Sequence, residues 1–94
     1  MVYCVVQIFG LPRDITDARN VEVELKNEAR AMSDLIAALR KKIPALEGPV
    51  IRVGEDRLVE RYKFNVNGRL YYDGMAFQLQ SGDRIALLTP MTGG

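Results

Sequence analysis

Two strongly apolar segments stand near the two ends of the chain. The first, Val2 to Phe9 (VYCVVQIF), is rich in β-branched and aromatic residues at both alternating sets of positions. This pattern predicts a strand that is buried on both faces and central in a sheet. The second, Arg84 to Thr89 (RIALLT), is also predicted to be a strand. Pro90 then ends sheet pairing, because proline has no N–H to donate.

A third strand is predicted from strict alternation of apolar and charged residues. It covers Val21 to Lys26, and its Glu22 and Glu24 fall on one face that is expected to meet water. With no pocket predicted there, the two carboxylates are given no catalytic role. The segment from Gly10 to Asn20 begins with a break at residues 10–14 and fits a long hairpin connection. We therefore expect the first two strands to be antiparallel neighbours.

A hairpin is predicted in the second half of the chain. Tyr62 to Val66 and Arg69 to Tyr72 flank Asn67-Gly68, and both positions of that turn tolerate a positive φ. Another turn is predicted at Ser81-Gly82-Asp83, directly before the final strand.

One helix is predicted between the second strand and this hairpin. Ser33 is the expected N-cap and Pro44 the stop signal. Residues 45–61 are expected to be a loop with a short extended piece at Val50 to Val53. Apolar residues recur at helical spacing and predict one buried stripe, formed by Leu35, Ile36, Leu39 and Ile43.

The order strand, strand, helix, loop, strand pair, strand predicts an α+β fold. Placing the first and last strands side by side at the centre would bury both best, and that pairing would be parallel. A mixed sheet of four to five strands with one main helix across it is the β-grasp, or ubiquitin-like, arrangement. We expect residues 1–89 to form this domain and residues 90–94 to form a flexible tail.

Composition narrows the range of functions. The 94 residues are enough for one domain, and the net charge of +1 gives no support for nucleic-acid binding. The chain has no histidine, so the commonest general base and metal ligand is missing. Cys4, the single cysteine, is expected to be a small buried apolar residue, and its solitary state suits a reducing, cytoplasmic compartment. Neither a signal peptide nor a membrane span is predicted, and no bound cofactor or metal is expected.

The candidate chemistry lies at Gly93-Gly94, which follow the last predicted strand. Glycine has no Cβ, so a diglycine end is thin and adopts backbone angles closed to other residues. Such an end can enter the active site of another protein and present its α-carboxylate there.

Several motifs resemble the small subunit of molybdopterin synthase. Phe9-Gly10-Leu11-Pro12-Arg13 is similar to the end of its first strand, F-A-x-L-R, and residues 32–39 are similar to its helix start. Ile43-Pro44-Ala45-Leu46 resembles the P-x-L after that helix, and Val66-Asn67-Gly68 its V-N-x hairpin. Residues 79–94, LQSGDRIALLTPMTGG, are similar to the G-D turn, final strand, proline and terminal diglycine.

The resemblance marks the sulfur-carrier superfamily more firmly than any one member of it. That superfamily also includes carriers for thiamine and cysteine synthesis and the archaeal ubiquitin-like modifiers. The chain departs from the pattern at Pro12, at Ala31, where a capping threonine is usual, and at Thr89, which replaces the first proline of the tail. These departures leave the diglycine intact and the pathway open.

What the resemblance implies is a protein that is not itself an enzyme. An E1-like adenylyltransferase would adenylate Gly94 with ATP, and a sulfur donor would convert the mixed anhydride to a thiocarboxylate. The tail, with Gly93 as its thin neck and Pro90, Met91 and Thr92 as partner-binding residues, would then enter the large subunit of molybdopterin synthase or an equivalent acceptor enzyme. Phe9 and Arg13 are expected at the docking surface.

Two alternatives stay open. The chain could be a ubiquitin-like modifier joined to other proteins through Gly94, or a carrier for thiamine, cysteine or tRNA thiolation. A third reading, a plain β-grasp interaction module, gives the diglycine no role.

Overall fold

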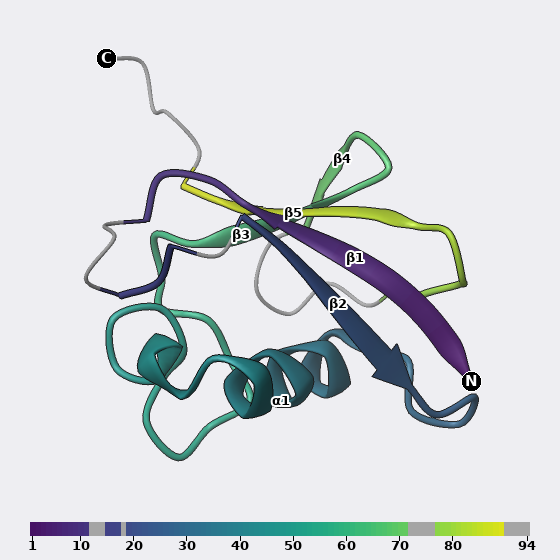
Figure 1. Cartoon of the computed structure of the whole chain (residues 1–94), viewed down its shortest axis with the longest axis horizontal. Helices are drawn as coiled ribbons and strands as arrows, with labels where there is room; N and C mark the ends of the chain where they lie inside the picture. The colour runs from purple at the N-terminus through teal and green to yellow at the C-terminus, as the bar shows by residue number, and fades with distance from the viewer. Residues whose placement is uncertain (12–14, 18, 72–76, 90–94) are drawn as a thin grey trace.

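The computed structural model describes residues 1–11, 15–17, 19–71 and 77–89. Within these residues a single five-stranded sheet is crossed by one α-helix (Figure 1). The elements, in chain order, are β1 (Val2–Ile8), β2 (Asn20–Leu25), α1 (Met32–Lys42), the 3-10 helix η1 (Pro44–Leu46), β3 (Lys63–Val66), β4 (Arg69–Tyr71) and β5 (Arg84–Leu88).

The first and last strands lie side by side at the centre of the sheet. The strand order is β2-β1-β5-β3-β4, and β1 pairs with β5 in parallel while the other pairs are antiparallel. Val5 is a convenient reference point, because it stands opposite Glu22 of β2 on one side and Arg84 of β5 on the other. The predicted α+β, β-grasp fold is therefore confirmed, including the central parallel pair.

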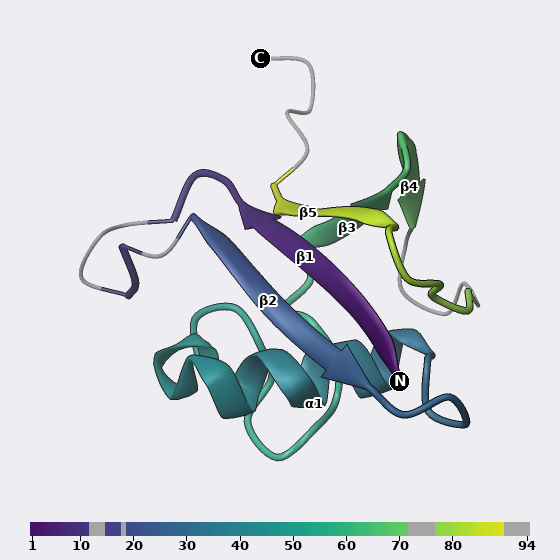
Figure 2. The same cartoon turned by 45° about the vertical axis from the view of Figure 1, so that its right-hand side comes forward.

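Within the part of the chain that the structure describes, only one face of this sheet is covered. Figure 2 shows α1 and the segment after it on the same side of the sheet. On β1 the inward side chains are buried, whereas Tyr3 and Val5 are 56% and 42% exposed, and Phe9, just beyond the strand, is 51% exposed. The prediction that this strand is buried on both faces is wrong. A single helix covers one face of an antiparallel or mixed sheet and leaves the other to water.

The start of α1 also differs from the prediction. The N-cap is Ala31, not Ser33, and the backbone N–H of Ala31 donates to Oδ2 of Asp34 at 3.0 Å. A carboxylate three residues into a helix can reach back in this way and supply half of a capping box when the cap residue has no side-chain acceptor. The helix ends at Lys42, one residue before the cap at Ile43, and Pro44 opens η1.

The segment predicted as a loop holds part of the core. Leu46, Val50 and Ile51 are fully buried, and Ile51 makes isolated bridges to Glu47 and Leu58 rather than a regular strand. Arg40 of α1 fastens this segment by ion pairs to the carboxylates of Glu47 at 3.0 Å and Asp56 at 2.7 Å. Buried apolar side chains and the ion pairs of Arg40 thus hold this segment in place of regular strand pairing.

No helix in the described residues is long and apolar enough to cross a bilayer.

Candidate functional site

The predicted tail begins where β5 ends. Pro90, Met91, Thr92, Gly93 and Gly94 lie outside the described residues, and so does Arg13. Their proposed roles, and the division into residues 1–89 and 90–94, therefore remain predictions. The structure describes the end of β5 and Thr89, which we call the platform.

That platform is held on both sides. The backbone N–H of Phe9 donates to the carbonyl of Leu87 at 3.0 Å, and Leu88 pairs with Lys63 of β3. The last residues of β5 therefore sit between β1 and β3 rather than at a free edge. Backbone bonds from two neighbouring strands therefore fix the position of this end of β5.

The Gly82-Asp83 turn fixes the start of β5. Gly82 has a φ of 91°, a conformation that suits a residue without a Cβ. The carboxylate of Asp83 accepts hydrogen bonds from the backbone N–H of Gln80 at 2.8 Å and from Nδ2 of Asn67 at 3.0 Å. The turn predicted from sequence is thus also a junction between β5 and the β3–β4 hairpin.

Asn67 completes this junction from the other side. Its φ of 52° places it in the left-handed region, as a type I′ hairpin turn requires. Its Oδ1 accepts from the backbone N–H of Arg84 at 2.9 Å, and its own N–H donates to the carbonyl of Arg84 at 2.8 Å. The G-D and N-G signals act together here to set the register of β5, a contact that the sequence pattern did not predict.

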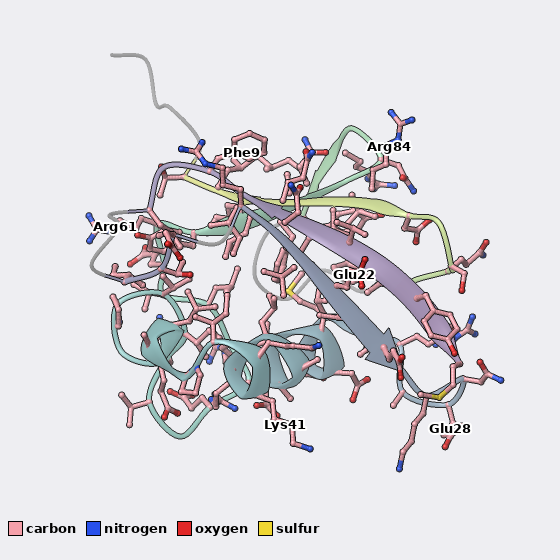
Figure 3. The ribbon with its side chains drawn as sticks, in the orientation of Figure 1. Phe9, Glu22, Glu28, Lys41, Arg61 and Arg84 are labelled. Carbon is pink, nitrogen blue, oxygen red and sulfur yellow. The ribbon has the colours of Figure 1, made fainter. Side chains whose placement is uncertain are left out.

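The predicted docking residue Phe9 lies on the open face of the sheet. Figure 3 shows Phe9 and Arg84 on the side of the sheet away from α1, whereas Lys41 projects from the helix. Tyr3 and Val5 share this face with Phe9, since they alternate with the buried residues of β1. These two were assigned to the core in the sequence analysis. The signal that could have revealed them was the presence of only one predicted helix.

Cys4 is confirmed as a buried apolar residue, 4% exposed. Burial, and then the nearby charge of Asp83, raises the pKa of its thiol above the ordinary value. The thiol donates to the carbonyl of Gln80 at 3.4 Å. A protonated, enclosed thiol is a poor sulfur nucleophile. Among the described residues, no group of three or more Cys, Asp or Glu side chains is placed to hold a metal ion.

Comparison with known proteins gives both a family and a set of similar folds. The pattern of the ThiS family matches residues 6–94. The crystal structure of small archaeal modifier protein 1 (SAMP1) from Haloferax volcanii is 25% identical, with a TM-score of 0.77, and the match covers 98% of this chain and 99% of that one.

Two further solved structures are similar in fold. SAMP1 from Methanosarcina acetivorans is 22% identical, with a TM-score of 0.74 and coverage of 100% of this chain and 98% of that one. A Pyrococcus furiosus protein assigned as subunit 1 of molybdopterin converting factor is 23% identical, with a TM-score of 0.68 and coverage of 97% and 100%. No match was found among curated proteins.

Proposed function

This chain belongs to the ThiS family, and from that premise we propose that it is a sulfur carrier whose reacting group is the α-carboxylate of Gly94. The observation that carries the proposal is the reach of the family match. It runs from residue 6 to residue 94, so one family pattern spans both the β-grasp body and the diglycine. The acceptor pathway we assign is molybdopterin synthesis, supported by the motif resemblance over residues 79–94 and by the fold shared with the Pyrococcus protein.

The chemistry begins with activation of an unreactive group. An α-carboxylate has a pKa of about 3.5 and is an anion at neutral pH, so it resists nucleophilic attack. An E1-like partner transfers AMP from ATP to Gly94 and releases pyrophosphate. A persulfide sulfur then displaces AMP, and a thiol reduces the resulting acyl disulfide to leave the thiocarboxylate. ATP and the sulfur donor are used by the partner, and the carrier supplies the acyl carbon.

The role of the folded body is to present the C-terminal residues to a partner protein. Pro90 to Gly94 can span about 17 Å at roughly 3.4 Å per residue, which is enough to reach a centre inside a partner. Ordering these residues costs on the order of 1–2 kcal/mol each. The end of β5 is already fixed between β1 and β3, and docking of the body through the face that bears Phe9 offsets the cost of ordering the tail in a partner.

Intact mass spectrometry tests the proposal. The chain is incubated with its E1-like enzyme, ATP and a sulfur donor, and one oxygen at the C-terminus should be replaced by sulfur. A variant lacking Gly94 should show no exchange, while the exposed helix variant Lys41→Ala should react like the wild type. An unchanged mass, under conditions in which another carrier of the family is converted, contradicts the proposal. The thiocarboxylate form is then offered to the large subunit of molybdopterin synthase with its pterin precursor, and failure to transfer sulfur excludes this acceptor.

A second function is favoured by the similarity to the archaeal modifier over nearly the whole of both chains. The adenylated Gly94 would then be transferred to lysine side chains of other proteins. Recovery of isopeptide-linked conjugates from cells, lost when Gly94 is deleted, would establish this role. Conjugates without thiocarboxylate would favour the modifier over the carrier.

A further inference from the structure

An apolar strip runs along the open face of β1. Of the five large apolar side chains that are most exposed in the described residues, Tyr3, Val5 and Phe9 face outward along this one line, with the exposed Gln7 between Val5 and Phe9. We call these three residues the outer strip. Exposed apolar residues gathered in this way mark interaction surfaces more often than isolated ones do.

Charges of opposite sign flank the outer strip. Glu22 of β2 and Arg84 of β5 both stand opposite Val5, so the three residues form one row across the sheet. With neighbouring strands about 4.8 Å apart, the two charged residues are separated by roughly 10 Å. Among the described residues neither side chain forms an ion pair. Figure 3 shows both labelled residues, Glu22 beside β1 and Arg84 near the start of β5.

This row is complementary to itself. In a face-to-face pair of copies, the two-fold axis can lie between the two sheets and run parallel to β1. The rotation exchanges the two sides of the strip, so Glu22 of each copy lies over Arg84 of the other. An axis across the strands would instead place Glu22 over Glu22. Only the first of these arrangements brings Glu22 of one copy against Arg84 of the other; Glu24, opposite Tyr3 on the same face, lies outside this row.

We propose that the open face binds a second copy of this chain in an isologous dimer. The outer strips pack against each other, and two Glu22–Arg84 pairs join the copies across the two-fold axis. Burial of apolar surface supplies the affinity, and the charges select the orientation. A closed two-fold interface of this kind uses the same surface on both partners and does not propagate. Because Phe9 is covered in the dimer, self-association competes with docking of any other protein on this face.

Charge reversal gives a direct test. Glu22→Arg alone places arginine against arginine, and Arg84→Glu alone places glutamate against glutamate, so each variant should be more monomeric than the wild type. Mixed together, the two variants restore both opposite-charge pairs, and they should form a heterodimer about tenfold tighter than either self-complex. The double variant should regain self-association. Sedimentation velocity over a range of concentrations and ionic strengths measures all four samples.

Two matched controls separate this interface from general charge effects. Glu28→Arg and Arg57→Glu reverse exposed charges that lie off the open face, in the β2–α1 connection and in the segment between η1 and β3. Their mixture should associate no more strongly than the wild type. Val5→Lys, at the centre of the row, should abolish association while circular dichroism shows the fold intact. The proposal is overturned if the wild type stays monomeric at millimolar concentration, or if the Glu22→Arg and Arg84→Glu mixture forms no heterodimer. Neither outcome depends on sulfur transfer.

Discussion

Along β1, Cys4, Val6 and Ile8 are packed beneath α1, whereas Tyr3 and Val5, one residue away from them, face water. Both sets of side chains are apolar, so composition does not distinguish them. What distinguishes them is that one helix covers one side of the sheet. The inner face stabilises the fold, and the outer face retains apolar surface that another protein chain can cover. The comparison can be tested by changing each face in turn.

The largest expected effect comes from adjacent leucines of β5. Leu87 is fully buried and Leu88 is half-buried. Leu87→Ala should lower the free energy of unfolding by about 2–5 kcal/mol, because it leaves a cavity in the core. Leu88→Ala should cost about 1 kcal/mol or less, because only part of its side chain leaves water on folding. Urea denaturation measures the free energy of unfolding of both variants. Equal losses of stability would contradict the proposed difference between the two faces of the sheet.

Neighbouring valines of β1 give a sharper test at constant shape. Val6→Thr should cost about 1–3 kcal/mol, since it buries a hydroxyl in an apolar site. Val5→Thr should change the free energy of unfolding by less than about 0.5 kcal/mol, because its hydroxyl meets water. Thermal unfolding followed by circular dichroism is sufficient. A loss of more than 1 kcal/mol for Val5→Thr would mean that the outer face is already covered.

Register decides which side of β5 faces inward, and the Asp83 carboxylate helps to fix it. A slip of one residue would exchange the two faces of the strand. Asp83→Ala removes the acceptor for Gln80 and Asn67, and should lower the free energy of unfolding by about 1 kcal/mol. Amide hydrogen exchange should show that the loss of protection is concentrated at the backbone amides of Arg84 and Ile85. Asp83→Asn keeps one acceptor oxygen and should lower the free energy of unfolding less than Asp83→Ala does. An equal decrease for the two variants would contradict the hydrogen-bonding account.

The smallest effect concerns Cys4 on the inner face. Because burial raises its pKa in the folded state, folding retains a proton that the unfolded chain releases above the ordinary thiol value of 9.0. Its contribution to stability is therefore complete below that pH and is lost as the pH rises toward the folded-state pKa. Comparing the free energy of unfolding of the wild type and Cys4→Ala between about pH 7 and pH 10 isolates the contribution of the thiol. Parallel stability curves for the two proteins would show that the thiol is not coupled to folding.

Much of the fold could be predicted because the signals were local. The Asn67-Gly68 hairpin, the helix and the alternation of Val21 to Lys26 each follow from short-range patterning. The parallel pairing of the end strands could be inferred as well, since it buries the two most apolar segments best. Ser33 was the wrong cap because the helix begins earlier, with Ala31 as its N-cap, and the Asp34 carboxylate three residues later accepts a hydrogen bond from the backbone N–H of Ala31.

The features that could not be predicted depend on contacts between distant segments. Leu46, Val50 and Ile51 enter the core without strand or helix periodicity, so no pattern marked them. Exposure of the outer strip follows from the single helix of the fold, and the apolar side chains of Tyr3, Val5 and Phe9 gave no sign of it. The bonds from Asn67 to Asp83 and Arg84 join two turns that were each predicted separately.

The central parallel pair has a consequence for synthesis. Tyr3 donates its backbone N–H to Ser81, 78 positions later, and β1 joins β2 to the rest of the sheet only through β5. A nascent chain that has not yet released β5 from the ribosome cannot close its sheet, so folding waits for nearly the whole sequence. Partners that recognise the folded body would thus ignore products that terminate before the end of β5.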